Sequence, residues 1–305
     1  MSSPGRKSSP VKPEASRSSL RVAVVQQNAA PTVAGNVERI EASARRACRA
    51  GAEVILFPEC ATTGYTFDFG RLDSREMRRV LRSVGELAAG LGVHLLVGSP
   101  VSDGRRWFNG LVVFDRQGRL EHVYAKCQLT AYDRRWFAPG NALALFRLDD
   151  VPATALICHE RRYPELVRIP VMAGARMIFH PNAGLDALAV SRAKRGGRDG
   201  IAVRAFENAV PYAFANTVGP QGDGKWSAGD SKIVEADGTL LRRADHRREG
   251  VVVATVDLTR ATGAYAVQGR EHPRFLAPFW RGILRATTRQ AVTSSRRFAD
   301  WFAGG

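Results

Sequence analysis

Short apolar runs, each about as long as a β-strand, alternate with helical stretches along most of the chain. We expect strands at residues 21–26, 54–57, 94–98, 111–114, 120–124, 154–157, 177–179, 212–215, 232–235 and 251–256. Apolar residues recur at helical spacing over 37–48, 77–91, 165–173 and 191–208, and Asn36 is a candidate cap for the first of these helices. The alternation predicts an α/β fold with mixed sheets, helices packed outside them, and loop residues gathered at one sheet edge.

The composition is that of a globular protein with one large domain. Of the 305 residues, 45% are hydrophobic and 24% are charged. Residues 1–19 are rich in Ser, Pro and basic residues, which predicts a disordered basic tail ahead of a domain at 20–280. Residues 281–305 are predicted to form a basic C-terminal extension. Because the chain shows neither a membrane-spanning apolar run nor a signal peptide, we expect a cytoplasmic protein without membrane contact.

The net charge of +16 raises nucleic-acid binding as an alternative. Residues 1–20 contribute +3 and residues 281–305 contribute +4, and the rest is spread along the body without an aromatic-interleaved basic run. Nucleic-acid binding is therefore not expected. The four cysteines are widely spaced, with no CxxC pair and no histidine cluster, so we expect free thiols and neither a metal site nor a cofactor.

Three chemically active residues each follow a predicted buried strand. Glu59 follows 54–57, Lys126 follows 120–124, and Cys158 follows 154–157. Taken singly, each has a simpler interpretation, as a solvated strand end or a small core residue. Together they suit nucleophilic catalysis by a thiol whose pKa is lowered by nearby positive charge. In that hypothesis the glutamate is the proton acceptor, and the lysine holds the oxyanion with the backbone N–H of His159.

Eight segments of the chain resemble the nitrilase, or carbon–nitrogen hydrolase, superfamily, whose triad is Glu–Lys–Cys. They are FPECATTGY at 57–65, YAKCQL at 124–129, WFAPG at 136–140, CHERRYPE at 158–165, HPNAG at 180–184, RAFEN at 204–208, ANTVG at 215–219 and GDS at 229–231. The resemblance implies a four-layer αββα sandwich that needs no metal or cofactor. It also implies a homodimer or higher homo-oligomer that associates through its outer helices.

Two positions depart from the pattern of the superfamily. Asp133 stands where many members have a second glutamate, and Gln128 stands where a histidine is usual. The shorter carboxylate of Asp133 could still contact Lys126 or position substrate. Cys60 and Cys127 adjoin two of the triad residues, and strand alternation predicts that they point away from the site and serve packing.

Two arginines bear on the substrate. Arg162 is the usual residue of the superfamily, whereas the additional Arg161 resembles the paired arginines of N-carbamoyl-D-amino-acid amidohydrolases, which help to hold a substrate carboxylate. Ion pairs with Glu160 or Glu165 are the alternative.

The remaining candidates shape the pocket. His159, His180 and Asn182 are expected near its edge, and Tyr65 and Trp136 are candidates for its walls. The resulting hypothesis is an amidase or carbamoyl-amide hydrolase acting on a small molecule through a thioester on Cys158, with release of ammonia or an amine. A nitrilase with the same triad is one alternative, and a catalytically weak binding or scaffold protein is another.

Overall fold

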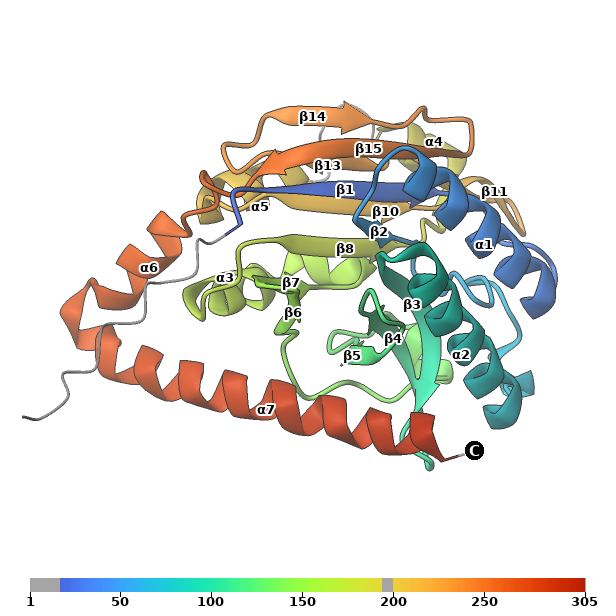
Figure 1. Ribbon diagram of the computed structural model, residues 1–305, viewed down its shortest axis with the longest axis horizontal. Helices are drawn as coiled ribbons and strands as arrows, with labels where there is room; N and C mark the ends of the chain where they lie inside the picture. The colour runs from blue at the N-terminus through green and yellow to red at the C-terminus, as the bar shows by residue number, and fades with distance from the viewer. Residues whose placement is uncertain (1–16, 194–199, 305) are drawn as a thin grey trace, which may run out of the picture.

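The computed structural model describes residues 17–193 and 200–304. Two six-stranded sheets pack face to face, and helices cover the outer face of each (Figure 1). The predicted four-layer αββα sandwich is confirmed. In the described part of the chain, no helix is long and apolar enough to cross a membrane.

The first sheet carries the strands that lead to Glu59 and Lys126. Its order is β15 (Gly250–Asp257), β1 (Ser19–Gln26), β2 (Val54–Leu56), β3 (His94–Ser102), β4 (Trp107–Phe114) and β5 (Leu120–Ala125). Strands β1, β2 and β3 are parallel, and β4 is antiparallel to both β3 and β5. Strands β2 and β5 therefore point the same way and deliver their following residues to one edge.

The second sheet carries the strand that leads to Cys158. Its order is β14 (Leu240–Arg243), β13 (Lys232–Val234), β10 (Tyr212–Asn216), β8 (Ile178–Asn182), β7 (Val151–Ala155) and β6 (Phe146–Leu148). Beside it lies a small sheet in the order β11 (Val218–Gly222), β12 (Lys225–Ala228) and β9 (Asp186–Ala187). The strands of both small-sheet pairs run antiparallel.

The core follows from the two-residue period of the strands. On β1, Val22 and Val24 face the second sheet, whereas Ala23 and Val25 face the helices outside. Both faces are buried, which is why β1 reads as a continuous apolar run rather than as an alternating one.

The helices are α1 (Val33–Arg49), α2 (Ser74–Leu91), α3 (Glu165–Met172), α4 (Leu188–Ala193), α5 (Ile201–Asn208), α6 (Ala264–Glu271) and α7 (Ala277–Ala303), with short 3₁₀ turns η1 (Phe69–Arg71), η2 (Asp133–Arg135), η3 (Cys158–Arg162) and η4 (Arg274–Leu276). Helices α1 and α2 contribute to the core outside the first sheet, and α3, α5 and α6 to the core outside the second.

Two details of the helix prediction are wrong. Thr32 caps α1 by accepting a hydrogen bond from the Gly35 N–H (3.1 Å), while Asn36 lies inside the helix and binds the backbone of Ala30. The predicted helix 191–208 is not continuous, because Gly200 has a φ of +78° immediately before α5. Residues 194–199, which belong to that prediction, lie outside the described residues.

Helix α7 crosses the molecule and docks on the first sheet by its C-terminal end (Figure 1). Phe298 packs edge-on against Phe108 of β4 at 5.2 Å, and the Trp301 indole N–H donates to the Ser74 hydroxyl (2.8 Å). The extension predicted from residue 281 falls inside this helix. Of the predicted tail, residues 1–16 lie outside the described residues, and Ser19 already begins β1.

Candidate active site

The structure brings Glu59, Lys126 and Cys158 together between the two sheets. Glu59 follows β2 and Lys126 follows β5 in the first sheet, whereas Cys158 begins η3 after β7 in the second. The Lys126 ammonium lies 2.7 Å from Glu59 Oε1, with both side chains fully buried. The negative charge of Glu59 acts on the Cys158 thiol and raises its pKa. At 4.0 Å, its Sγ also approaches the carbonyl of Ala183, whose N–H donates to Glu59 Oε2 (3.0 Å).

Asp133 completes the buried charge cluster. Its Oδ2 lies 2.9 Å from the Lys126 ammonium, so the shorter carboxylate does reach the lysine. The same oxygen accepts from the backbone and hydroxyl of Thr130, and Oδ1 accepts from the Tyr65 hydroxyl (2.8 Å). One ammonium therefore lies between two carboxylates, and Thr130 and Tyr65 hold Asp133 in place.

Asn109 is a site residue that sequence reasoning missed. It lies on β4, fully buried, and its amide donates to Glu59 Oε1 (2.8 Å) and to Asp133 Oδ1 (3.2 Å). A single Asn inside the apolar run WFNGLVVF was the available signal, since a buried amide requires partners.

The environment drives the pKa values of the two carboxylates apart. Burial raises the pKa of Glu59 above its usual value, against the opposing charge of Lys126. Burial alone would raise the pKa of Asp133 too, but Lys126, Thr130 and Tyr65 hold it below its usual value. Burial alone would lower the pKa of Lys126, and the Glu59 charge, with help from Cys158 and Asp133, raises it well above the usual range. Asp133 is thus the permanent counterion, and Glu59 is the carboxylate suited to take up a proton.

The low pKa predicted for Cys158 is wrong. Burial and the neighbouring Glu59 charge raise the pKa of this thiol to about 12, although Lys126 and Arg161 oppose the change. The sequence shows the positive charges but not the burial or the proximity of the glutamate. The resting group is therefore a thiol. Its backbone has a φ of +54°, a left-handed conformation that turns the side chain out of the strand direction.

Glu160 joins the two sheets at the site. Its carboxylate accepts from the backbone N–H groups of Ile157 (2.7 Å), Cys127 (2.7 Å) and Gln128 (3.0 Å), and from the Tyr124 hydroxyl. The loop that carries Cys158 is thereby tied to the loop that follows Lys126. Gln128 takes part through its backbone, so the departure from histidine does not affect this link.

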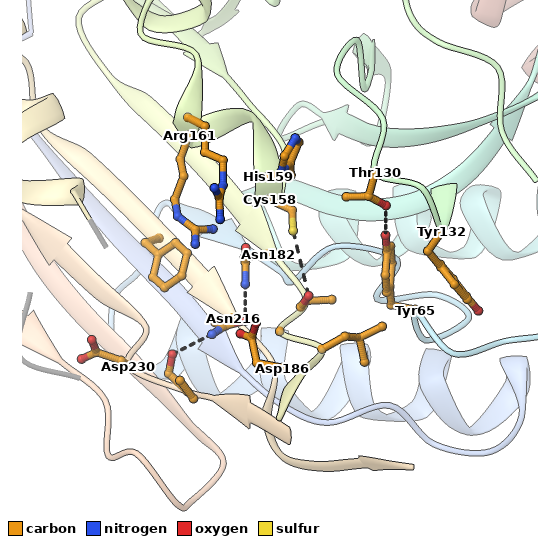
Figure 2. A pocket seen from close by; sticks show the side chains of 17 residues that line it. Tyr65, Thr130, Tyr132, Cys158, His159, Arg161, Asn182, Asp186, Asn216 and Asp230 are labelled. Carbon is orange, nitrogen blue, oxygen red and sulfur yellow. Dashed lines mark hydrogen bonds between the residues drawn. The ribbon is translucent and has the colours of Figure 1, made fainter. Parts of the chain in front are cut away.

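The arginines of CHERRYPE face the pocket rather than the acids of their own segment. Neither Arg161 nor Arg162 forms an ion pair with an acidic side chain among residues 17–193 and 200–304, so the alternative of pairing with Glu160 or Glu165 is not observed. Both line a cavity of about 280 Å³ that also reaches Cys158 (Figure 2).

Other candidates divide between the pocket and its surroundings. Tyr65, His159 and Asn182 line the cavity, and the Oδ1 atom of Asn182 is buried without a hydrogen-bond partner in the described part of the chain. In Figure 2 the amide of Asn182 lies between Cys158 and Arg161, and its nitrogen donates a hydrogen bond to Asn216 Oδ1 (2.7 Å).

Two predicted pocket residues lie elsewhere. Trp136 is 36% exposed and packs near Phe69, away from the cavity lining. His180 is buried behind Cys158, where its ring contacts the Cys158 carbonyl. Each is the first residue of a motif segment, WFAPG or HPNAG, and a motif fixes the neighbourhood of its residues but not the direction of each side chain.

The cysteines beside the triad serve packing, as predicted, but one lies closer to the site than expected. Cys127 packs against the core between the sheets, and its thiol approaches the Ala142 carbonyl (3.2 Å). Cys60 is buried, and its thiol contacts Asn109 Oδ1 (3.7 Å) beside the charge cluster. Neither lines the cavity.

Known proteins share this fold and its sequence pattern. The family model described as carbon–nitrogen hydrolase matches residues 21–265. A probable nitrilase from Schizosaccharomyces pombe is 29% identical over 221 residues, covering 68% of this chain and 76% of that protein. The 2-oxoglutaramate amidase of Bacillus subtilis is 30% identical over 217 residues, covering 68% and 79%. A solved amidase from Nesterenkonia sp. has a TM-score of 0.73 at 24% identity, covering 86% of this chain and 97% of that one, which establishes the common fold.

Proposed function

Because the chain belongs to the carbon–nitrogen hydrolase family, we propose that it hydrolyses a small acidic amide or N-carbamoyl compound through a thioester on Cys158. The observation that carries the proposal is the buried Glu59–Lys126–Asp133 cluster beside a thiol that opens into an arginine-lined cavity. A scaffold protein has no need of two carboxylates and an ammonium kept dry at such a place, since burying charge costs free energy.

The first proposed step is attack by sulfur on the carbonyl carbon. Glu59 Oε1 already accepts from Lys126 and Asn109, whereas Oε2 accepts only from the Ala183 backbone among described residues. Oε2 is therefore the oxygen that takes the thiol proton. Lys126 uses two of its three N–H bonds on Glu59 and Asp133, and the third is available to the oxyanion.

Collapse of this intermediate breaks the C–N bond. The proton held by Glu59 passes to the nitrogen, so ammonia or an amine leaves and the acyl group stays on the sulfur as a thioester. Glu59 then deprotonates a water that attacks the thioester, and its proton returns to the departing thiolate. Atoms and protons balance over the cycle without a metal or cofactor.

The residues that line the cavity support the proposed substrate class. Two guanidinium groups without acidic partners in the described chain line a cavity beside the nucleophile. A planar guanidinium suits a carboxylate because two parallel N–H bonds fix it. The unpaired Asn182 Oδ1 adds one acceptor for a substrate N–H. A small compound with a carboxylate some distance from its amide satisfies both.

Release of ammonia from a panel of acidic amides, neutral amides, N-carbamoyl amino acids and nitriles tests the proposal. The Arg161→Ala variant should lower kcat/KM for acidic substrates by about tenfold or more, since a hydrogen bond to a charged group contributes roughly 1.5–3 kcal/mol. Arg161→Lys should give a smaller loss, and neutral amides should be nearly unaffected by either change. Arg82→Ala is the control, because Arg82 is exposed on α2 and does not line the cavity. An unchanged ratio of acidic to neutral rates would refute the substrate class, and a preference for nitriles would identify a nitrilase.

We also propose that the chain forms a homodimer or higher homo-oligomer through its outer helices. Large apolar side chains are exposed on α5, α6, η4 and the start of α7, namely Val203, Phe206, Tyr265, Phe275 and Phe279. Phe206 and Tyr265 lie 6.2 Å apart, which joins the α5 and α6 parts of this surface. Exposed apolar surface of this kind is typical of an interface. Light scattering on the purified protein would measure its mass.

A further inference from the structure

The peptide group between Cys158 and His159 has its N–H and its carbonyl on opposite sides, and each can take part in a different hydrogen bond. The His159 N–H has no hydrogen-bond acceptor within the described ranges, so it is available to an oxyanion. The carbonyl of the same peptide group belongs to Cys158, whose φ of +54° places it in a sparsely populated conformation. Because a peptide group is planar, any contact that fixes the carbonyl also fixes the direction of the N–H.

His180 makes that contact. It lies on β8, fully buried, with Nε2 at 3.0 Å from the Cys158 carbonyl oxygen and Nδ1 at 2.9 Å from the Tyr212 hydroxyl. A carbonyl can only accept, so Nε2 must carry the hydrogen. Nδ1 of this neutral ring then accepts from the Tyr212 hydroxyl. Tyr212, on the adjacent parallel strand β10, therefore sets the tautomer that lets His180 donate.

We propose that His180 is a positioning residue that holds the Cys158–His159 peptide group with its N–H directed at the developing oxyanion. The chain Tyr212 to His180 to the Cys158 carbonyl also polarises this peptide group, because hydrogen bonds in series strengthen one another. A polarised peptide N–H is a better donor to negative charge. The inference rests on the proposed function, since it takes Cys158 as the nucleophile.

Burial explains why the arrangement is stable before substrate arrives. His180 and Tyr212 are both fully excluded from solvent, and the His180 ring also contacts Phe214 at 4.8 Å. Water cannot replace the histidine as a donor at this position. A variant that loses the donor therefore leaves the Cys158 carbonyl without this bond, and the peptide group can rotate away from its catalytic direction.

Two substitutions of His180, by Gln and by Asn, test whether the position of the donor matters. Both introduce a side-chain amide, but the amide reaches a different distance in each. In His180→Gln the side-chain amide reaches about as far as Nε2 and can still donate to the carbonyl. In His180→Asn the amide reaches only as far as Nδ1 and cannot. Tyr212→Phe keeps the ring and removes the hydroxyl that selects the tautomer.

The test compares two reactions of the same thiol. Acylation by p-nitrophenyl acetate passes through an oxyanion, whereas methylthiolation by methyl methanethiolsulfonate involves no carbonyl. Cys158→Ala gives the background for both. We expect His180→Asn to slow acylation about tenfold or more, below the 10²–10³ seen when an oxyanion donor is lost entirely. His180→Gln should recover most of the rate, Tyr212→Phe should lose a few-fold, and methylthiolation should stay within about twofold of wild type throughout.

Equal acylation rates in His180→Asn and His180→Gln would overturn the inference. A parallel fall in methylthiolation would do the same, because it would mean that the histidine only keeps the thiol in place. Neither result depends on the acidic substrate class, which is tested by the ratio of acidic to neutral amide hydrolysis in the wild-type and Arg161 variants.

Discussion

Replacing Glu59 by Gln should slow substrate turnover and at the same time speed up alkylation of the Cys158 thiol. The variant keeps the shape of the side chain and an oxygen for Lys126 and Asn109, but it cannot accept a proton. Turnover should therefore fall by roughly two to four orders of magnitude, the usual contribution of a general base. The alkylation of the thiol should become faster, because Glu59 is one of the two main reasons why its pKa is about 12.

The size of the second effect follows from the charge that is removed. Two unit charges ~4 Å apart interact by about 4 kcal/mol at an effective dielectric constant of ~20. If only about 1 kcal/mol of this acts on the thiol, the thiolate fraction rises about fivefold, since 1.36 kcal/mol corresponds to one pKa unit. Lys126 and Arg161 remain in the variant and favour the thiolate.

The assay measures ammonia release and iodoacetamide labelling of Cys158 on the same preparations, from pH 7 to pH 9, with labelling located by peptide mass. Asp133→Asn is the matched control, because it also removes one carboxylate from Lys126 but leaves the proton acceptor. It should lose at least tenfold less turnover than Glu59→Gln. Near-normal turnover in Glu59→Gln would refute the assignment of Glu59 as the base, whereas slower labelling would refute the claim that the Glu59 charge controls the reactivity of the Cys158 thiol.

Two further predictions concern pH and stability. Glu59 must be ionised to accept a proton, so kcat/KM should fall as the pH drops through a value above 4.5. In Asp133→Asn this fall should move to lower pH, because the Asp133 charge helps to raise the pKa of Glu59. An acid limb at the same pH in both proteins would contradict this coupling. Phe298→Ala should lower the free energy of unfolding by about 3–5 kcal/mol in chemical denaturation, as for other buried aromatics, whereas Val292→Ala on the exposed side of α7 should change it by less than about 0.5 kcal/mol.

The sequence predicted the site residues that lie in motifs directly after a strand. It missed the residues that lie within a strand and contact the site from there. Glu59, Lys126 and Cys158 each follow an apolar run, so each lies where a strand of its own sheet ends. Asn109 and Tyr212 approach from the middle of a strand or from its start, and only the register of neighbouring strands places them. A single polar residue in an apolar strand is a signal for a buried contact, but it does not identify the partner.

The burial of individual side chains was the property that the sequence predicted least well. Counting the charges near Cys158 suggested a thiolate, whereas the structure encloses the sulfur and sets a carboxylate against it. The same limit applies to Trp136 and His180, whose positions in the chain were read correctly while the directions of their side chains were not. The helix prediction failed at Gly200 for a local reason, since apolar spacing says nothing about a left-handed glycine.

Because Glu59, Lys126 and Cys158 are divided between two sheets, activity depends on how the two sheets dock during folding and separate during unfolding. Glu59 and Lys126 come from one sheet and Cys158 from the other, so neither half of the sandwich holds a catalytic unit by itself. During folding, activity can arise only once the sheets have docked, and the bonds from the Cys127 and Gln128 backbone to Glu160 form at that same step. Partial opening between the two sheets would separate Glu59 from Cys158 while most of the secondary structure survived. Catalysis therefore reports on the integrity of the sandwich more sensitively than circular dichroism does, and a chain cut between residues 114 and 120 or 148 and 151 would regain activity only if its fragments reassociate.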